Sequence, residues 1–251
     1  MLKFFRSIRR KVIDERNLRR YLIYAFGEVC LVVIGILLAL QVNNVNENRK
    51  KKNLEVETLK ELQESLISNF DNMISSTETL KVDIDKIKSL VTHLEARKPY
   101  TDELQELFYH PYRARSFIVN RSAFEMLENR GIDIISNKEL RGQIVEHYNF
   151  SLALMEAFTR SERERIDDFR IYYQTKIVPN NEDSFLGHTN RIYPKTDPIQ
   201  YEEILNDQIF ISQLKWRISR TKMIVDRVET LWAKETQELE KKIIEELQKL
   251  D

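Results

Sequence analysis

Apolar residues recur at helical spacing along most of this 251-residue chain. The clearest series steps by three and four positions and comprises Leu59, Leu62, Leu66, Phe70, Met73, Thr77, Leu80, Ile84, Ile87, Val91 and Leu94. This heptad-like series predicts one helix over about residues 48–97, roughly 75 Å long at 1.5 Å per residue. An extra step of four, from Leu66 to Phe70, is a stutter in an otherwise coiled-coil pattern.

Two more long amphipathic helices are expected nearer the C-terminus. The first, over residues 136–177, begins at a capping box of Ser136 and Glu139. Its apolar face comprises Leu140, Ile144, Tyr148, Met155, Phe158, Phe169, Tyr173 and Ile177. The second covers residues 207–250, with Ile211, Leu214, Ile218, Val225, Val228, Trp232, Leu239, Ile243 and Leu247 on one face. The charged stretch at residues 160–165 is expected to face solvent.

Shorter elements connect these helices. We expect a helical turn at residues 102–109, a buried extended segment at 116–119, and a helix that begins at the capping box of Ser122 and Glu125. Gly131 is expected to end that helix as a left-handed cap. Residues 178–197 contain Asn, Pro and Gly187 and predict a long loop, after which Asp197 would cap a helix with Pro198 at its first position.

A second pattern, near the N-terminus, predicts a membrane span. Residues 21–42 contain no Lys, Arg or Asp and a single Glu, and 22 helical residues reach roughly 33 Å, enough to cross a bilayer core. A cleaved signal peptide is the competing interpretation. Because the bulky sequence from Leu38 to Asn43 offers no small-x-small cleavage site, we expect an uncleaved single-pass anchor.

The predicted fold is therefore all-α: a single transmembrane helix over residues 21–42 that continues into an elongated extracytoplasmic helical bundle or coiled coil over residues 43–251. Three long helices can pack as an antiparallel bundle. Composition agrees, since the chain has only 5 Gly and 5 Pro, too few for many tight turns. Its 1 Cys excludes a disulfide framework.

Charge is distributed unevenly, although 40 Lys+Arg balance 40 Asp+Glu overall. Residues 1–20 hold eight basic and two acidic side chains, whereas residues 53–251 hold 28 basic and 36 acidic ones. Four basic residues at 49–52 follow the span. The larger basic count before the span predicts a cytoplasmic N-terminus and a body outside the cytoplasm, and this distribution argues against nucleic acid as a partner.

The basic segment at residues 1–20 also has a regular apolar pattern. It suits a short amphipathic helix in the membrane interface, although an unstructured basic tag that only sets topology is a close alternative. Under the first interpretation, the residues predicted to contact the membrane surface are Phe4, Phe5, Arg6, Arg9 and Arg10.

Glu28 is the one charged residue in the predicted span, about 10 Å deep by helical rise. On a helix, Glu28, Gly35 and Ala39 share one face, and Gly35 and Ala39 form a small-x-x-x-small pair that lets helices approach closely. Three roles stay open for Glu28: a protonated hydrogen-bonding group in a self-oligomer, a contact with a cation or ion path in a multi-span partner, or a group near the interface that reaches lipid headgroups.

The first 50 residues resemble one bacterial family of single-pass membrane proteins known only as a domain of unknown function. The resemblance is carried by the strings YAFGE at 24–28, LVVIGIL at 31–37, ALQ at 39–41, NN at 43–44 and NENR at 46–49, and by the basic start with Phe4, Phe5, Arg6, Ile8 and Arg9. Looser matches follow at Leu127, Gly131, Ile135, Leu140 and Arg141. The resemblance implies a Gram-negative inner-membrane protein and assigns no activity. Together with the orientation indicated by the basic residues, it predicts that the C-terminal domain is periplasmic.

The sequence contains no recognisable catalytic or cofactor-binding pattern. None of the four His residues is at ligand spacing with another His or with Cys30, so no metal site is expected. No Gly-rich loop is suited to phosphate, and neighbouring carboxylates on a helix point about 100° apart. We therefore expect a protein that is not an enzyme and has no cofactor.

Three functions fit these features. A membrane-anchored helical scaffold, self-associating through the Glu28 face as a homo-oligomer, fits the heptad series and the polar small-residue face best. An extracytoplasmic sensor could bind a ligand between Tyr172, Tyr173, His188 and Arg191 and the predicted loop. A subunit of an ion-coupled complex could use Glu28 as a titratable group beside a multi-span partner.

Overall fold

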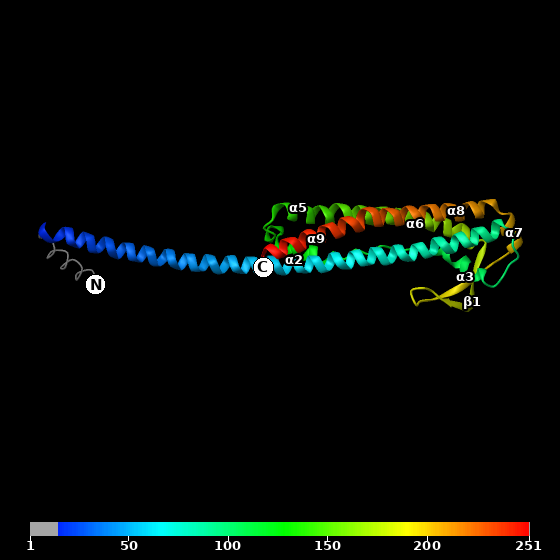
Figure 1. The fold of residues 1–251 in the computed structure, drawn as a ribbon, viewed down its shortest axis with the longest axis horizontal. Coiled ribbons are helices and arrows are strands. Elements are labelled where there is room, and N and C mark those ends of the chain that lie inside the picture. The colour runs from blue at the N-terminus through cyan, green and yellow to red at the C-terminus, as the bar shows by residue number, and fades with distance from the viewer. Residues whose placement is uncertain (1–14, 251) are drawn as a thin grey trace. The chain divides into compact units, whose positions relative to one another are not determined.

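The computed structural model describes residues 15–250, with side chains from residue 22 onward. The five residues predicted to contact the membrane surface (Phe4, Phe5, Arg6, Arg9 and Arg10) lie outside this range. The chain divides into two compact units, residues 1–54 and residues 55–251. Most of the described chain is helical (Figure 1).

Helix α2 (Glu15–Glu95) contains both the apolar segment and the heptad series in 81 residues. It is continuous because no Pro or Gly interrupts the sequence between Gly35 and Pro99. It ends two residues before Arg97, whose φ of 51° is left-handed and incompatible with a further helical turn. The predicted end at residue 97 is therefore close, and the predicted continuation of the apolar segment into the long helix is confirmed.

The second unit is built from three helical rods. The first is residues 55–95 of α2. The second comprises α5 (Lys138–Glu146), a π turn η3 (His147–Ser151) and α6 (Leu152–Gln174). The third comprises α8 (Gln208–Arg227), a π turn η4 (Val228–Trp232) and α9 (Ala233–Leu250). Both long C-terminal helices were expected, but not the π turns that interrupt them. The second rod ends at Gln174, so Ile177, which was expected on its apolar face, lies in a strand instead.

The rods do not form the expected antiparallel bundle, because the first two run in the same direction and only the third is antiparallel to them (Figure 1). Ser136, just before α5, donates hydrogen bonds to Glu55 at the start of the first rod. Tyr173 near the end of α6 donates to the Phe108 carbonyl, and His110, two residues after Phe108, binds Asp83 toward the C-terminal end of α2. The second rod therefore starts where the first starts.

This arrangement depends on the connection over residues 96–137, which returns along α2. It comprises α3 (Leu104–Tyr109), η1 (His110–Tyr112), an irregular stretch at 113–121, α4 (Ser122–Arg130) and η2 (Ile132–Ile134). Ser65 and Asn69 both donate to the carbonyl of Asn120 at 3.0 Å, which fixes the returning chain against the helix. Phe117 in this stretch is buried as expected, whereas Ile118 is exposed.

Local capping differs from the sequence expectation at α4. Asn120 accepts hydrogen bonds from the backbone and the hydroxyl of Ser122, so Ser122 does not form the predicted capping box. The helix ends at Gly131 as predicted, and the Gly131 N–H donates to Leu127. Its φ of 102° and ψ of 123° lie outside the left-handed helical region, however, so the cap is of another type.

Two other predicted helix caps also differ from those in the structure. Asn137 caps α5 by accepting from the N–H groups of Glu139 and Leu140, which leaves Ser136 free to bind Glu55. Asp197 does not cap a helix, because it lies in a strand, and α7 (Tyr201–Asn206) begins three residues after Pro198. Asp207 caps α8 through the Phe210 N–H, at the start predicted for the last helix.

The predicted loop over residues 178–197 is wrong: the segment forms a β-hairpin. Strands β1 (Ile177–Leu186) and β2 (Ile192–Pro198) pair antiparallel, from Ile177 opposite Pro198 to Leu186 opposite Ile192, with an irregularity between Asn180 and Ser184. Each strand of a two-stranded sheet has a free edge, and Pro is tolerated at such edges. The prolines that indicated a loop are therefore compatible with strands.

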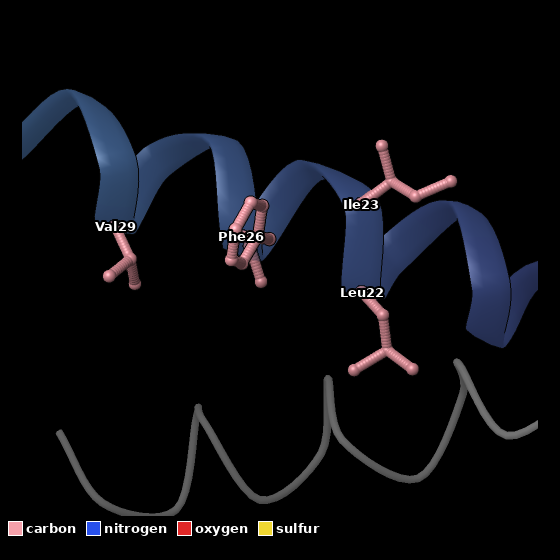
Figure 2. Close-up of a pocket in the computed structure, with 5 residues that line it drawn as sticks. Leu22, Ile23, Phe26 and Val29 are labelled. Carbon is pink, nitrogen blue, oxygen red and sulfur yellow. The ribbon is translucent and has the colours of Figure 1, made fainter.

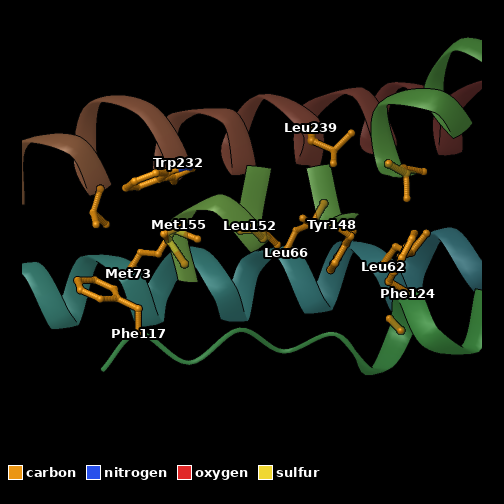
Figure 3. Packing of buried hydrophobic residues seen from close by; sticks show 14 of the residues in the cluster. Leu62, Leu66, Met73, Phe117, Phe124, Tyr148, Leu152, Met155, Trp232 and Leu239 are labelled. Atoms are coloured by element: carbon orange, nitrogen blue, oxygen red, sulfur yellow. The ribbon is translucent and has the colours of Figure 1, made fainter. Parts of the chain in front are cut away.

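Two clusters of buried apolar residues form the core of the second unit. The larger joins all three rods and includes Leu62, Leu66, Tyr148, Met155 and Trp232 (Figure 3). The smaller comprises residues of α2, α3, α6, α7 and α8 together with Ile177. Every residue of the predicted heptad series is buried or half-buried, which confirms that its period is helical.

The charged stretch at residues 160–165 is not entirely solvated. Glu162 is buried and accepts two hydrogen bonds from the Arg220 guanidinium, at 2.7 and 2.6 Å, which join α6 to α8. The neighbouring residues at 160 and 163–165 are exposed as expected. Bidentate pairing with an arginine compensates the cost of burying this carboxylate.

Candidate functional site

The apolar segment of α2 is long and apolar enough to cross a membrane. Its 18-residue window has a mean hydropathy of 2.5, and none of it is buried by the described residues. Figure 2 shows Leu22, Ile23, Phe26 and Val29 projecting from the helix. A soluble domain does not leave so long an apolar surface uncovered, so this segment needs lipid or another apolar partner.

The structure places Glu28, Gly35 and Ala39 together on this segment, all three exposed. Seven and eleven residues are close to two and three turns of a helix, so the three residues lie within about 40° of one another around the axis. A methyl group added at Gly35 meets no atom of the described residues within 4 Å, so nothing in the described unit occupies this face. The face is therefore free to contact another helix.

The second unit contains a buried cluster of charged residues that sequence reasoning missed. Asp83 on α2 is fully buried, and its Oδ1 atom lies 2.7 Å from both His110 Nδ1 and Arg113 Nη1. His110 and Arg113 are also buried. We call these three residues the Asp83 cluster. It joins α2 to the returning connection, because His110 at the start of η1 and Arg113 directly after η1 bind the same carboxylate.

The β-hairpin packs against the Asp83 cluster. The Arg113 guanidinium lies 5.0 Å from the centre of the Tyr193 ring, and the Phe185 ring lies 6.0 Å from that of His110. A hydrogen bond with Thr189 lowers the pKa of Tyr193, and the Arg113 charge lowers it further against the opposing effect of burial. Aromatic rings of the hairpin therefore separate the buried ion pair from solvent.

Arg217 of α8 supports the cluster from the other side. It is buried and donates to the Arg113 carbonyl at 2.6 Å, and also to Thr221 on its own helix. Burial lowers the pKa of Arg217 to about 10, with the Asp83 charge opposing that change. The guanidinium thus satisfies a backbone carbonyl of the returning chain and fixes the stretch that holds Arg113.

A buried carboxylate that orients an imidazole is also an arrangement used in acid–base catalysis. Here the other ring nitrogen, His110 Nε2, is buried as well, has no hydrogen-bond partner, and lies 3.7 Å from Glu106 Oε1. A substrate has no access to that nitrogen in this structure. The geometry therefore supports a structural role, in which the cluster fixes the hairpin and the connection on α2.

The residues proposed for a ligand pocket under the sensor hypothesis contact different elements of the second unit. Tyr173 is buried and donates to the Phe108 carbonyl, and Tyr172 donates to Asp207 at the cap of α8. His188 lies at the turn of the hairpin, 3.3 Å from Thr79, while Arg191 is exposed on the same turn. Among the described residues, no group of three or more His, Cys, Asp or Glu could hold a metal ion.

Comparison with family models, with curated proteins and with solved structures gave no match.

Proposed function

We propose that this protein is a membrane-anchored helical scaffold that self-associates through the face formed by Glu28, Gly35 and Ala39. The exposed apolar segment of α2 supports the anchor, and the uncovered small-residue face beside a carboxylate supports association. In a bilayer, a protonated Glu28 can donate to a carbonyl or carboxyl of a second copy, which satisfies a group that lipid cannot.

The resemblance of the first 50 residues supports a bacterial inner membrane as the location of this scaffold, and the basic residues support its orientation. Because Lys and Arg are retained on the cytoplasmic side, residues 1–20 stay in the cytoplasm and residues 43–251 form a periplasmic domain. The bundle then presents its surface to periplasmic partners, while the basic segment contacts anionic lipid. Its fixed arrangement, with a buried Asp83 cluster and two apolar cores, suits a rigid interaction module.

Substitution at two glycines tests the association. Full-length protein in native membranes is compared with Gly35→Leu, which adds bulk on the proposed face, and with Gly27→Leu, a matched control about 80° around the helix from Gly35. Both glycines have open space beside them within the described residues. We expect Gly35→Leu to reduce the oligomer at least about tenfold, roughly 1.4 kcal/mol, and Gly27→Leu to leave it nearly unchanged.

Cysteine cross-linking tests which face is used. Native Cys30 lies about 160° from Glu28 around the helix, whereas Val32 lies only about 40° from it. Under oxidising conditions, Val32→Cys in a Cys30→Ser background should cross-link, and the wild type should not. Cross-linking through Cys30, equal sensitivity of the two glycines, or a strictly monomeric protein would each refute the scaffold.

Glu28→Gln separates self-association from a multi-span partner. If a multi-span protein co-purifies with the wild type and is lost from the variant, Glu28 contacts that partner, and the ion-coupled function replaces the scaffold. If only this protein is recovered, as an oligomer weakened by the variant, the scaffold is supported. Affinity purification from native membranes, followed by mass spectrometry, distinguishes the two results.

A further inference from the structure

The second and third rods each contain a π turn, and η3 contacts the third rod just after η4. η3 is joined to the third rod by a hydrogen bond from Ser151 to Glu235, and His147 Nε2 lies 3.3 Å from the Thr236 hydroxyl. π turns are rare and occur frequently at functional sites, because the extra residue changes the direction of side chains along a helix. A pair of them in neighbouring helices is therefore an unusual local feature.

A cavity of about 420 Å³ lies between the second and third rods and is lined in part by both π turns. Its apolar wall includes Phe150 from η3, Leu154 from α6 and Leu231 from η4, which are 66%, 49% and 42% exposed. Ligand pockets in proteins have volumes of about 300–1,000 Å³ and combine an apolar lining with a few polar groups. The cavity is therefore the right size for a small organic molecule, and its apolar wall is open to solvent.

The charged groups that line the cavity are mostly acidic. Among the described residues that line it, Glu146, Glu235 and Glu238 are acidic, and Lys242 is the one Lys or Arg. Burial, with a smaller effect of the Arg121 charge, lowers the pKa of His147 to about 4, so its imidazole adds no positive charge at neutral pH. The lining therefore carries two net negative charges.

Two of these carboxylates are placed to act together. Glu235 is held by the Ser151 hydroxyl, and Glu238 follows it three residues later on α9, so both lie on the same side of that helix. The nearest partner of Glu238 is Lys234, at 3.8 Å in an exposed pair, which is a weak interaction. Both carboxylates can therefore accept hydrogen bonds from a cation beside the apolar wall.

We propose that this cavity binds a small hydrophobic amine, whose apolar body contacts Phe150, Leu154 and Leu231 while its protonated amino group lies between Glu235 and Glu238. The chemical requirements are an apolar group and one positive charge at its end. A carboxylate of the same shape is repelled by the acidic rim, and an alcohol of the same shape lacks the ionic interaction. Such binding is a function distinct from the membrane scaffold.

Titration with three probes of one shape tests this site. Full-length protein in nanodiscs is titrated calorimetrically with phenethylamine, 2-phenylethanol and phenylacetate, and empty nanodiscs provide the correction for partitioning into lipid. We expect saturable binding of phenethylamine, at least about tenfold weaker binding of the alcohol, and no detectable binding of phenylacetate.

Variants then assign the binding to this cavity. Glu235→Gln/Glu238→Gln should weaken phenethylamine binding about tenfold, whereas the matched control Glu245→Gln, an exposed residue of α9 outside the cavity, should leave it unchanged. Phe150→Ala should weaken it about fivefold without unfolding the protein, because that side chain is 66% exposed.

Three results would overturn the proposal: no binding of phenethylamine above that of empty nanodiscs, equal binding of the three probes, or equal affinities for the wild type and the double variant. Because none of these measurements uses the Glu28 face, they are independent of the test of self-association.

Discussion

Removal of the Asp83 carboxylate should destabilise the second unit more than any surface change on the same helix. Asp83→Ala leaves the buried Arg113 and His110 without their shared acceptor. Breaking a buried ion pair by deleting one partner costs about 3–5 kcal/mol, because the remaining charge is buried and uncompensated. Domains of about 150–250 residues lose roughly 2–4 °C in Tm per kcal/mol, so we expect a decrease of about 6–20 °C.

The matched control is Asp85→Ala, two residues further along α2. The Asp85 side chain is 76% exposed and pairs only with Lys88, at 3.1 Å within the same helix. Exposed pairs of this kind contribute about 0.5 kcal/mol or less, so Tm should change by no more than about 2 °C. Thermal unfolding of the full-length protein in nanodiscs, followed by circular dichroism at the helical band, measures both variants.

A double-mutant cycle with Arg113→Ala assigns the loss to the pair itself. If the carboxylate acts through Arg113, the double variant should be less destabilised than the sum of the single variants, with a coupling energy of about 1–3 kcal/mol. A loss below about 1 kcal/mol for Asp83→Ala, or equal losses for Asp83→Ala and Asp85→Ala, would show that the cluster does not fix the connection on α2.

Two further predictions concern pH and the hairpin. Because the pKa of His147 is lowered to about 4, the folded state binds fewer protons than the unfolded state between pH 4 and 6.5. The free energy of unfolding should therefore decrease by about 3 kcal/mol as pH falls through that range. In urea unfolding, His147→Gln should remove this part of the pH dependence, and an unchanged dependence would contradict the prediction. In Gly187→Ala the new methyl carbon would lie 2.6 Å from Tyr193 Cε2, so the ring must shift from its place beside Arg113, and limited proteolysis within residues 178–197 should accelerate. Gly142→Ala, which has open space, is the control, and equal cleavage of the two variants would refute the packing.

Helical period made much of this architecture predictable. The faces from Leu59 to Leu94 and from Ile211 to Leu247 are buried because a helix that packs on one side must place apolar residues every three or four positions. The same pattern also indicated a buried charged residue in the Asp83 cluster. Asp83 lies three residues after Leu80 and four before Ile87, on the buried face, and a carboxylate there requires a partner.

The partners of Asp83 could not be predicted, because His110 and Arg113 are 27 and 30 residues away and no local pattern links them. The hairpin was missed for a related reason. Its pairing of Ile177 with Pro198 joins residues that are distant along the chain, and the prolines within it resemble those of a loop. Its position is determined by contacts of Phe185 and Tyr193 with α3 and Arg113 rather than by strand propensity.

The sequence by itself determined the helices, their apolar faces, and the apolar segment with Glu28, Gly35 and Ala39 on one side, because these properties depend on residues within a few turns of each other. Only the tertiary structure decided that the first two rods are parallel, that Asp83 binds His110 and Arg113, and that Phe150 and Glu235 line one cavity. Each of these depends on where a long connection brings distant residues, and that is set by the packing of the whole unit rather than by local sequence.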